Sequence, residues 1–386
     1  MRHLIQSLAK ALGLVLLVLL GAEAGLWLYT DGAFTEPNFY QHDDALRITL
    51  IPDSQMRLSY LGVEPYTTVH INSAGFRGEE LPVPSTNEVV VIGDSLTFGL
   101  GVEYDQTYSA LLQEHLGGNR TVLNLGVPSY LMHEQTQIVK QVLTERNPAQ
   151  IIYALSVGRM LGGQTMPSGA RFNFDNGWLI AGKTGNVAVP LPLPNSMMRS
   201  SHIVNLIRQT MRDPSREAFT RMIVEQRANE LLAKAKRASD ERARLQSVGW
   251  FELMGPDGSP RSWSTLLPEL RSLKATMAGS DTQLTLLLLP QDFVLHEAAW
   301  DKYKMAPIDI TAVQLLSEDL HATAQAIGLD LVDASDALRT AGPQTTLPRD
   351  WHFSPLGHQV IAQVLSEHLA STAHNPVKTQ THRSDR

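Results

Sequence analysis

The chain has 386 residues, of which 43% are hydrophobic and 18% charged, and its formal net charge is -7. This composition is typical of a globular protein with about two domains, and the acidic balance argues against nucleic acid as a partner. The chain contains no cysteine, which excludes disulfides, thiolate nucleophiles and cysteine metal sites.

The first 30 residues have the features of an export signal. A short basic segment precedes the apolar run ALGLVLLVLL, and the apolar character continues to Tyr29 with Glu23 as the interruption. Residues 11–29 are long enough for a membrane-spanning helix, whereas Ala22-Glu23-Ala24 fits the cleavage pattern of a secretory signal. We favour an uncleaved inner-membrane anchor with the remainder of the chain in the periplasm. Secretion after signal cleavage is the alternative.

Apolar strands alternate with helical segments from Glu88 onward, after an extension of short strands over residues 31–86. Strands are expected at residues 88–92, 120–127, 150–156, 282–290 and 329–334, and helices at residues 107–118, 133–146 and 309–328. Such alternation places parallel strands beneath helices on both faces of a sheet. The pattern therefore predicts an α/β domain with a five-stranded parallel sheet.

Residues 160–281 separate the third strand from the fourth and are too numerous for a simple crossover. We expect a largely helical insertion here, including a long charged helix that Asp213-Pro214 would cap and begin. The predicted organisation is a signal at 1–30, the extension at 31–86, the α/β domain with its insertion at 87–370, and a disordered tail at 371–386.

One motif resembles a nucleotide-binding site. The segment GWLIAGKT, Gly177 to Thr184, satisfies the phosphate-loop formula, but no buried strand precedes it and three prolines preclude a helix after it. We expect two strands joined by a turn over residues 178–189 and no nucleotide ligand. The thirteen histidines form no ligand-spaced cluster, so neither a metal nor another cofactor is expected.

Three polar residues at the ends of predicted strands form the candidate site. Ser95 follows the first strand in VVIGDSLTFG, where open parallel sheets bind their ligands. Asp350 and His352 follow the last strand in DWHFSPLGH. A serine hydroxyl needs a base, and that base needs a group to fix its tautomer. This predicts Ser95 as nucleophile, His352 as base and Asp350 as the orienting acid; His358 is the rival base, with packing or capping as its expected role.

The blocks VVIGDSLTFG, LNLGVPSY and DWHFSPLGH together resemble the SGNH hydrolase superfamily, also called GDSL esterases. The resemblance extends to its membrane-anchored bacterial members associated with cell-surface polysaccharide, and it covers residues 65–160 and 282–370. It implies a flavodoxin-like three-layer α/β/α fold. It also implies that the backbone N–H groups of Ser95 and Gly126 form the oxyanion hole.

The third block of the family departs from its pattern in this chain. The pattern G-x-N-D falls on Ser156-Val157-Gly158-Arg159, so Gly158 replaces the asparagine whose side chain would complete the oxyanion hole. Loss of one such donor costs about 10²–10³-fold in turnover. Arg159 is the candidate substitute donor, and Gln164 from the insertion is another.

Resemblance and export signal together imply an exported serine esterase or O-acyltransferase. The expected substrates are acyl esters, above all acetyl esters, of a bacterial surface polysaccharide. The expected partners are this acylated carbohydrate and the membrane, through the N-terminal apolar helix. A lipid esterase is one alternative, and Gly158 motivates a second, a catalytically degenerate glycan-binding or assembly subunit.

Overall fold

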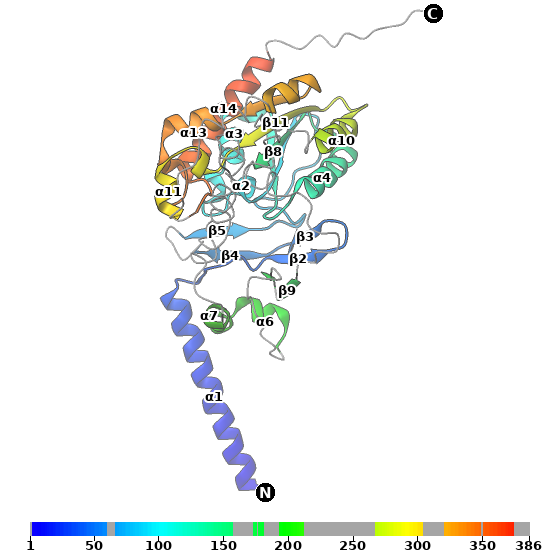
Figure 1. Cartoon of the computed structure of the whole chain (residues 1–386). Coiled ribbons are helices and arrows are strands. Elements are labelled where there is room, and N and C mark those ends of the chain that lie inside the picture. Colours follow the sequence, from blue (N-terminus) through cyan, green and yellow to red (C-terminus); the bar gives the residue numbers. More distant parts are fainter. Residues whose placement is uncertain are drawn as a thin grey trace, which may run out of the picture. The chain divides into compact units, whose positions relative to one another are not determined.

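The computed structural model describes residues 2–59, 66–156, 173–175, 177–180, 193–211, 267–303, 320–348 and 350–373 (Figure 1). The chain divides into two compact units. The first comprises Met1–Leu81, Leu100–Tyr104 and Thr165–Arg227, and the second Pro82–Gly99, Asp105–Gln164 and Ala228–Arg386. The expected extension and the first part of the expected insertion thus belong to one unit, and the predicted sheet belongs to the other.

The second unit is built on a parallel sheet of five strands. These are β6 (Glu88–Gly93), β7 (Thr121–Gly126), β8 (Gln150–Ser156), β11 (Gln283–Leu289) and β12 (Asp330–Asp333). Their order is β12-β11-β8-β6-β7, with every pair parallel. Read from β7, this is the 2-1-3-4-5 order of flavodoxin-like sheets. The predicted fold class is confirmed, and each strand begins and ends within one residue of its predicted bounds.

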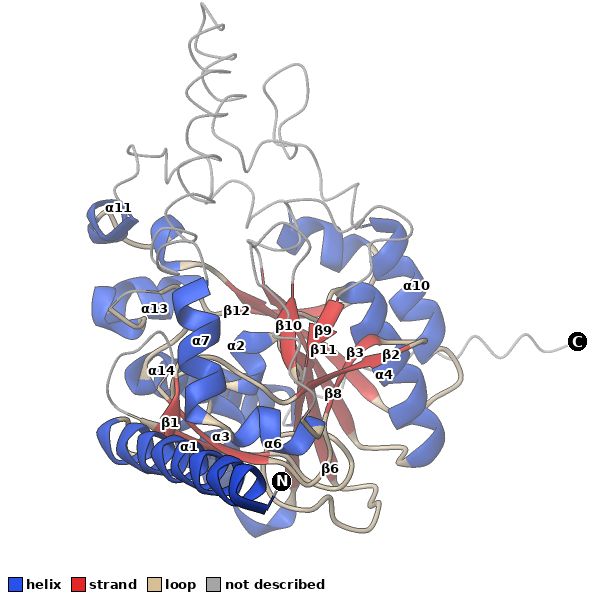
Figure 2. Cartoon of the chain, turned by 90° about the horizontal axis from the view of Figure 1, so that it is seen from below, coloured by secondary structure: helices blue, strands red, loops and turns tan. Residues whose placement is uncertain are grey.

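Helices cover both faces of this sheet (Figure 2). One face carries α3 (Tyr108–Leu116), α13 (Ser335–Ala341) and α14 (Pro355–Ala373), and the other carries α4 (Met132–Glu145) and α10 (Leu267–Met277). Strands β6 and β8 are buried along their whole length. This accounts for their continuous apolar runs, because strands covered on both faces have no solvated side.

Two predicted helices lie largely or wholly outside the described residues. The helix expected over residues 309–328 falls mostly in the gap at 304–319, and the long helix after Asp213-Pro214 falls in the gap at 212–266. The tail also lies outside them, apart from its first three residues, which continue α14 to Ala373.

The first unit consists of short strands, two short helices and one long helix. Its strands are β1 (Ala33–Phe34), β2 (Tyr40–Asp43), β3 (Arg47–Leu50), β4 (Gln55–Leu58), β5 (Thr67–His70), β9 (Asn173–Asp175) and β10 (Trp178–Ile180). Strands β1, β4 and β5 form one small sheet, while β2 pairs with β3 and β9 with β10. Buried and exposed residues alternate along β4 and β5, as expected for strands with one covered face.

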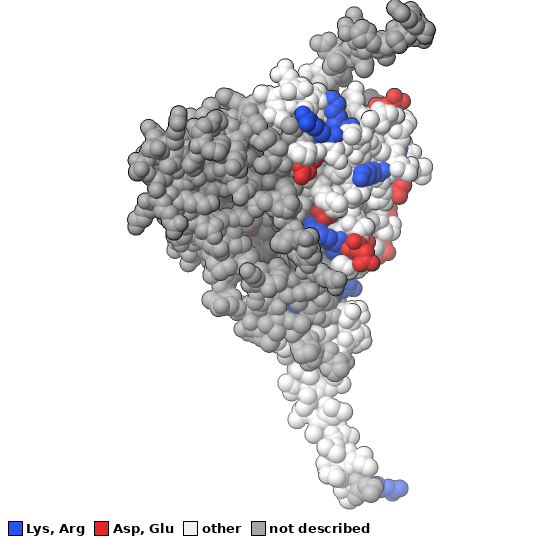
Figure 3. Space-filling model, turned by 45° about the vertical axis from the view of Figure 1, so that its right-hand side comes forward, with Lys and Arg blue, Asp and Glu red and all other residues white. Residues whose placement is uncertain are grey.

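Helix α1 (Arg2–Tyr29) contains the predicted export segment. Among the described residues it is the one helix long and apolar enough to cross a membrane by length and composition, with a mean hydropathy of 2.1 and 0% of that window buried. Figure 3 shows almost no charged surface along it. A core helix would be buried in the protein, so this helix fits either a membrane anchor or a signal sequence.

Gly177 of the phosphate-loop match has a structural role. It lies in the turn between the antiparallel strands β9 and β10 with φ at 89°, a conformation that favours glycine. Its carbonyl accepts the N–H of Tyr40 at 2.9 Å, and a Cβ at this position would overlap the backbone of Asn38. Residues 181–189 of the expected two-strand segment lie outside the described residues; the described partner of β10 precedes it in sequence.

A buried ion pair stabilises the amino end of β6. Arg146 donates from Nη2 and Nε to the two carboxylate oxygens of Glu88 at 2.6 and 2.9 Å, and the Glu88 side chain is fully buried. Removal of one partner leaves an uncompensated buried charge. We therefore expect Arg146→Met to lower the free energy of unfolding by about 3–5 kcal/mol, as measured by urea denaturation.

The matched control for Arg146→Met is Arg339→Met, since Arg339 pairs with the solvent-exposed carboxylate of Asp336. Exposed pairs contribute about 0–1 kcal/mol. Equal losses of stability in the two variants would contradict a stabilising role for the buried pair.

Candidate active site

Ser95 is the first residue of the short helix α2 (Ser95–Phe98), directly after β6 and Asp94. Asp94 caps this helix, because its Oδ1 accepts the N–H of Leu96 at 2.9 Å. Gly93 ends the strand, and a Cβ there would overlap Thr97, so the tight strand-to-helix turn requires glycine. These contacts fix the Ser95 hydroxyl at the carboxyl edge of the sheet.

Asp350 and His352 lie in the loop before α14, and bonds across this loop hold its shape. The N–H of Leu347 donates to the His352 carbonyl at 2.8 Å, and the N–H of Ser354 donates to the Thr345 carbonyl at 2.9 Å. The loop is therefore a small closed turn whose ends are fixed to each other.

His352 connects Ser95 to Asp350. Its Nε2 lies 2.8 Å from Ser95 Oγ, and its Nδ1 lies 2.7 Å from Asp350 Oδ1. All three residues are buried, with exposed fractions of 9% for Ser95, 4% for His352 and 3% for Asp350. Because a carboxylate only accepts hydrogen bonds, Nδ1 of the neutral imidazole carries the proton and the Nε2 lone pair faces the serine hydroxyl. The structure thus brings the three residues of the predicted triad into one hydrogen-bonded line.

The orientation of the His352 ring is fixed by its neighbours in the loop. The backbone N–H of His352 also donates to Asp350 Oδ1, at 3.1 Å. The indole of Trp351 stacks on the imidazole with ring centroids 5.8 Å apart and an interplanar angle of 25°. Both contacts limit rotation of the ring away from Ser95.

A half-buried lysine fixes the position of the Asp350 loop. Lys302, in α11 (Ala298–Tyr303), donates to Asp292 Oδ2 and to the Asp350 carbonyl, both at 2.6 Å, and to Thr346 Oγ1 at 3.3 Å. The Lys302 side chain is 15% exposed and that of Asp292 is 2% exposed. Sequence reasoning missed both residues, although Asp292 follows the fourth strand much as Ser95 follows the first.

Gly126, the expected second oxyanion donor, makes a different contact in this structure. Its N–H donates to Asn124 Oδ1 at 2.9 Å, and Asn124 Nδ2 donates to the Thr97 carbonyl and to Ser109 Oγ, both at 2.8 Å. A Cβ on Gly126 would overlap Thr97 and the backbone of Phe98. Glycine is thus required for β7 to approach α2, and its N–H is occupied by an internal hydrogen bond.

Several backbone N–H groups that follow the carboxyl ends of β6 and β7 have no hydrogen-bond partner within the described part of the chain. They include those of Ser95 and of Ser129, three residues after β7. Ser129 has φ at 77°, a left-handed conformation that is uncommon for serine. Nothing in the residue type reveals such a conformation, so sequence reasoning missed Ser129.

His358, the rival base, packs against Tyr108 at the start of α3. Its Nδ1 accepts the backbone N–H of Tyr108 at 3.1 Å, at the start of α3, and its ring stacks on that of Tyr108 with centroids 5.7 Å apart. Burial raises the pKa of the Tyr108 hydroxyl, which stays protonated and lies 2.7 Å from Thr97 Oγ1. His358 therefore stabilises the layer beneath α2, as expected for a capping residue.

The predictions for the third sequence block concern residues outside the described ranges. Gly158, Arg159 and Gln164 lie in the gap at 157–172, so the substitute oxyanion donor stays a prediction. No group of three or more His, Asp or Glu residues in the described ranges is arranged to hold a metal ion.

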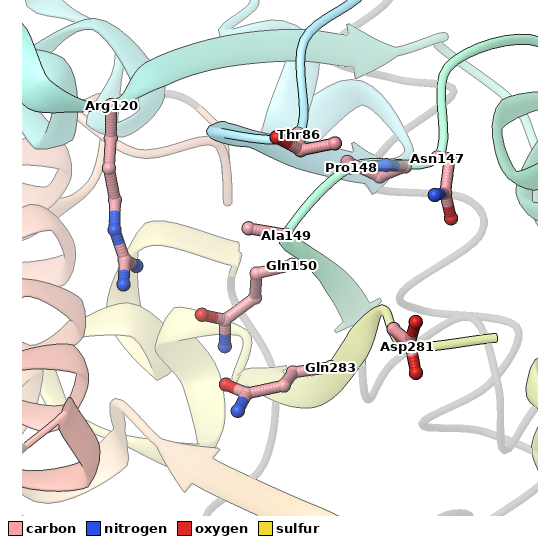
Figure 4. A pocket seen from close by; sticks show the side chains of 8 residues that line it. All are labelled: Thr86, Arg120, Asn147, Pro148, Ala149, Gln150, Asp281 and Gln283. Carbon is pink, nitrogen blue, oxygen red and sulfur yellow. The ribbon is translucent and has the colours of Figure 1, made fainter.

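A pocket lies at the opposite, amino edge of the sheet (Figure 4). Gln150 and Gln283, the first residues of β8 and β11, line it. Because Ser95 and His352 lie beyond the carboxyl ends of the strands, this pocket is separate from the candidate active site.

Comparison with known proteins yields structural likeness alone. No family model matches the chain, and no curated protein matches it. One similar solved structure is a putative lipolytic protein of the G-D-S-L family from Desulfitobacterium hafniense, with 12% identity, coverage of 73% of this chain and 98% of that chain, and a TM-score of 0.36. Another is a lipase/acylhydrolase from Enterococcus faecalis, with 11% identity, coverage of 74% and 96%, and a TM-score of 0.35. A carbohydrate acetylesterase family member from Sinorhizobium meliloti has 13% identity, coverage of 75% and 99%, and a TM-score of 0.36. Likeness at this level does not assign an activity.

Proposed function

We propose that this chain is an exported serine hydrolase or acyltransferase that acts on carboxylic esters. The observation that carries the proposal is the hydrogen-bonded line from Ser95 through His352 to Asp350. It lies at the carboxyl edge of a parallel sheet, where such folds bind their ligands. Serine, an adjacent base and a group that orients the base are the parts of a nucleophilic acyl-transfer site.

In the first half of the reaction, Ser95 Oγ attacks the ester carbonyl while His352 Nε2 takes its proton. The tetrahedral intermediate collapses when the C–O bond to the alcohol breaks and His352 returns the proton to the leaving oxygen. An acyl-serine remains. In the second half, His352 deprotonates water or a sugar hydroxyl, which attacks the acyl carbonyl. The bond to Ser95 Oγ then breaks, and His352 returns the proton to that oxygen. Asp350 accepts the hydrogen bond from His352 Nδ1–H throughout the reaction and stabilises the imidazolium.

The negative charge on the tetrahedral intermediate needs backbone donors. The N–H of Ser95 is without a partner in the described residues and suits this role. We infer that Ser129 supplies the second donor, because its N–H follows the neighbouring strand β7 and is also unpartnered among those residues. Gly126 could donate only after its bond to Asn124 breaks.

The substrate class that we propose is an acyl ester, above all an acetyl ester, of a bacterial surface polysaccharide. Its support is the resemblance of the three sequence blocks together with the export segment. The test compares acetate release from an O-acetylated polysaccharide with acid release from long-chain p-nitrophenyl esters. A preference for acetyl groups supports the proposal, and a preference for long chains would instead make the protein a lipid esterase. A degenerate binding subunit would hydrolyse neither substrate.

Replacement of Lys302 tests how far catalysis depends on the position of the Asp350 loop. Lys302→Met removes the link between Asp292 and the Asp350 carbonyl and takes the ammonium charge away from a buried carboxylate. A displacement of about 1 Å costs on the order of 10²-fold in rate. We expect kcat for ester hydrolysis to fall by about this factor while KM changes little.

Lys302→Arg serves as the conservative control, since it keeps the charge and should restore part of kcat. A proportional loss of folded protein in Lys302→Met, with unchanged kcat per folded molecule, would show that Lys302 acts on stability alone.

A further inference from the structure

The carboxyl-terminal end of α1 is an integral part of the first unit. The Glu23 carboxylate accepts hydrogen bonds from Ser201 Oγ at 2.8 Å and from the backbone N–H groups of His202 and Ile203. Thr30 Oγ1, one residue beyond the helix, lies 3.2 Å from His202 Nδ1. Two positions near the end of α1 are therefore bonded to the start of α7 (His202–Met211).

This arrangement accounts for the charged residue within an apolar helix. A carboxylate in a membrane-spanning segment is costly unless it is paired. At Glu23 the unsatisfied first N–H groups of α7 and the positive end of its helix dipole compensate the charge. Cleavage after Ala24 would remove the carboxylate and leave those donors without their acceptor. The structure thus favours a mature protein that retains α1.

The Glu23 contact also sets the level of α7 relative to the membrane. Glu23 precedes Tyr29 by six residues, about 9 Å along a helix axis. If residues 11–29 span the hydrocarbon layer, the start of α7 lies about 9 Å inside its boundary, within the depth of about 5–10 Å to which interfacial helices bury their apolar face. Trp27 and Tyr29, which are 53% and 87% exposed, are residue types enriched in that zone. Figure 1 shows α6 (Asn195–Ser200) and α7 beside this end of α1.

The α6–α7 segment, residues 193–208, exposes large apolar side chains. Leu193, Met197 and Leu206 are 45%, 58% and 44% exposed. Met198 and Val204 in the same segment are buried against Ile207, so the segment has an inner packed side. Exposed apolar residues beside a membrane helix suit insertion into the headgroup region of a bilayer.

The charge of this region complements an anionic lipid surface. No Asp or Glu occurs in the described stretch of residues 193–211, whereas Arg199 and Arg208 are basic. The Arg208 guanidinium lies 4.4 Å from the centroid of the Trp178 ring, which ties one of these charges to the unit. Basic residues near a membrane surface gain about 1 kcal/mol each from anionic lipids.

We propose that the α6–α7 segment rests on the lipid surface as a second membrane contact, held beside a retained helix α1 by Glu23. The bilayer is the partner, through anionic headgroups and the outer part of the acyl chains. This contact would restrain the first unit close to the membrane, which a single helix with a free linker would not do.

Because the chain has no cysteine, single reporter positions can be introduced without background. The full chain is reconstituted in phosphatidylglycerol–phosphatidylcholine vesicles with Met197→Cys, Leu206→Cys or Thr68→Cys, each labelled with the fluorophore NBD. Thr68 is an exposed residue of β5 in the same unit and is the control. We expect brominated lipid to quench positions 197 and 206 at least threefold more than position 68, and aqueous iodide to show the reverse. Equal iodide quenching at all three positions would overturn the proposal.

Two further measurements test the role of Glu23. In Glu23→Gln, lipid quenching at position 206 should fall at least twofold, and unchanged quenching would show that Glu23 does not hold the segment. Intact-mass spectrometry of the membrane-extracted protein should give the chain with α1 attached, and loss of residues 1–24 would overturn the proposal. None of these readouts depends on ester hydrolysis, so they stand apart from the test of the proposed activity.

Discussion

Ser95→Ala should abolish ester hydrolysis while leaving the fold intact. The Ser95 hydroxyl lies 2.8 Å from His352 Nε2, and no covalent acyl intermediate can form without it. Loss of the nucleophile in serine hydrolases costs about 10⁶-fold in kcat, with residual rate from binding and the oxyanion hole alone. Initial rates on a chromogenic acetyl ester measure the effect, with thermal unfolding as the check on folding.

Ser335→Ala is the matched control for that variant, because Ser335 begins α13 in the same unit and no hydrogen bond in the described structure joins it to His352. The Ser335→Ala variant should hydrolyse esters at the same rate as the unsubstituted protein. If Ser95→Ala retained more than about one hundredth of the activity, Ser95 would not be the nucleophile, since that loss is far smaller than removal of a nucleophile produces.

Asp350→Asn is expected to lower kcat by about 10⁴-fold without unfolding the protein. The amide keeps the size of the carboxylate but can donate to His352 Nδ1, which would place the imidazole proton on Nε2. In that tautomer the ring offers the Ser95 hydroxyl a donor instead of a lone pair. Single-turnover rates of acylation report this step directly, and the defect should lie in kcat more than in KM.

The chain offers a close control for Asp350→Asn at the amino edge of the same sheet. Asp330 Oδ2 lies 2.7 Å from His368 Nε2, the same type of pair in the same unit. Asp330→Asn should leave kcat unchanged. Similar losses in the two variants would mean that the effect of Asp350 comes from stability and not from the orientation of His352.

The sheet could be predicted from the sequence because each of its strands has a characteristic pattern within a few consecutive residues. Strands covered on both faces must be apolar throughout, so β6, β8 and β11 appear as uninterrupted runs in the sequence. The same topology places the residues after each strand at one edge. Ser95 and His352, 257 positions apart, could therefore be predicted to lie at the same edge without any knowledge of side-chain packing.

The parts that escaped prediction depend on contacts between distant segments or on backbone angles. Asn38 donates to the Arg199 carbonyl 161 positions away, a type of contact that joins the extension and part of the insertion into one unit. Lys302 reaches the Asp350 loop through space, and no spacing rule links the two. The positive φ of Ser129 and the internal bond of the Gly126 N–H are likewise properties of the folded backbone.

Covalent labelling measures most directly whether His352 activates the Ser95 hydroxyl. The full-length protein in detergent is treated with a fluorophosphonate, digested, and the modified peptide identified by mass spectrometry, with His352→Ala as the comparison. We expect a single adduct on Ser95 that forms at least 10³-fold more slowly when His352 is absent, because an unassisted serine is a weak nucleophile. A folded protein with no adduct, or with an adduct on Ser95 that forms equally fast without His352, would contradict the proposed site.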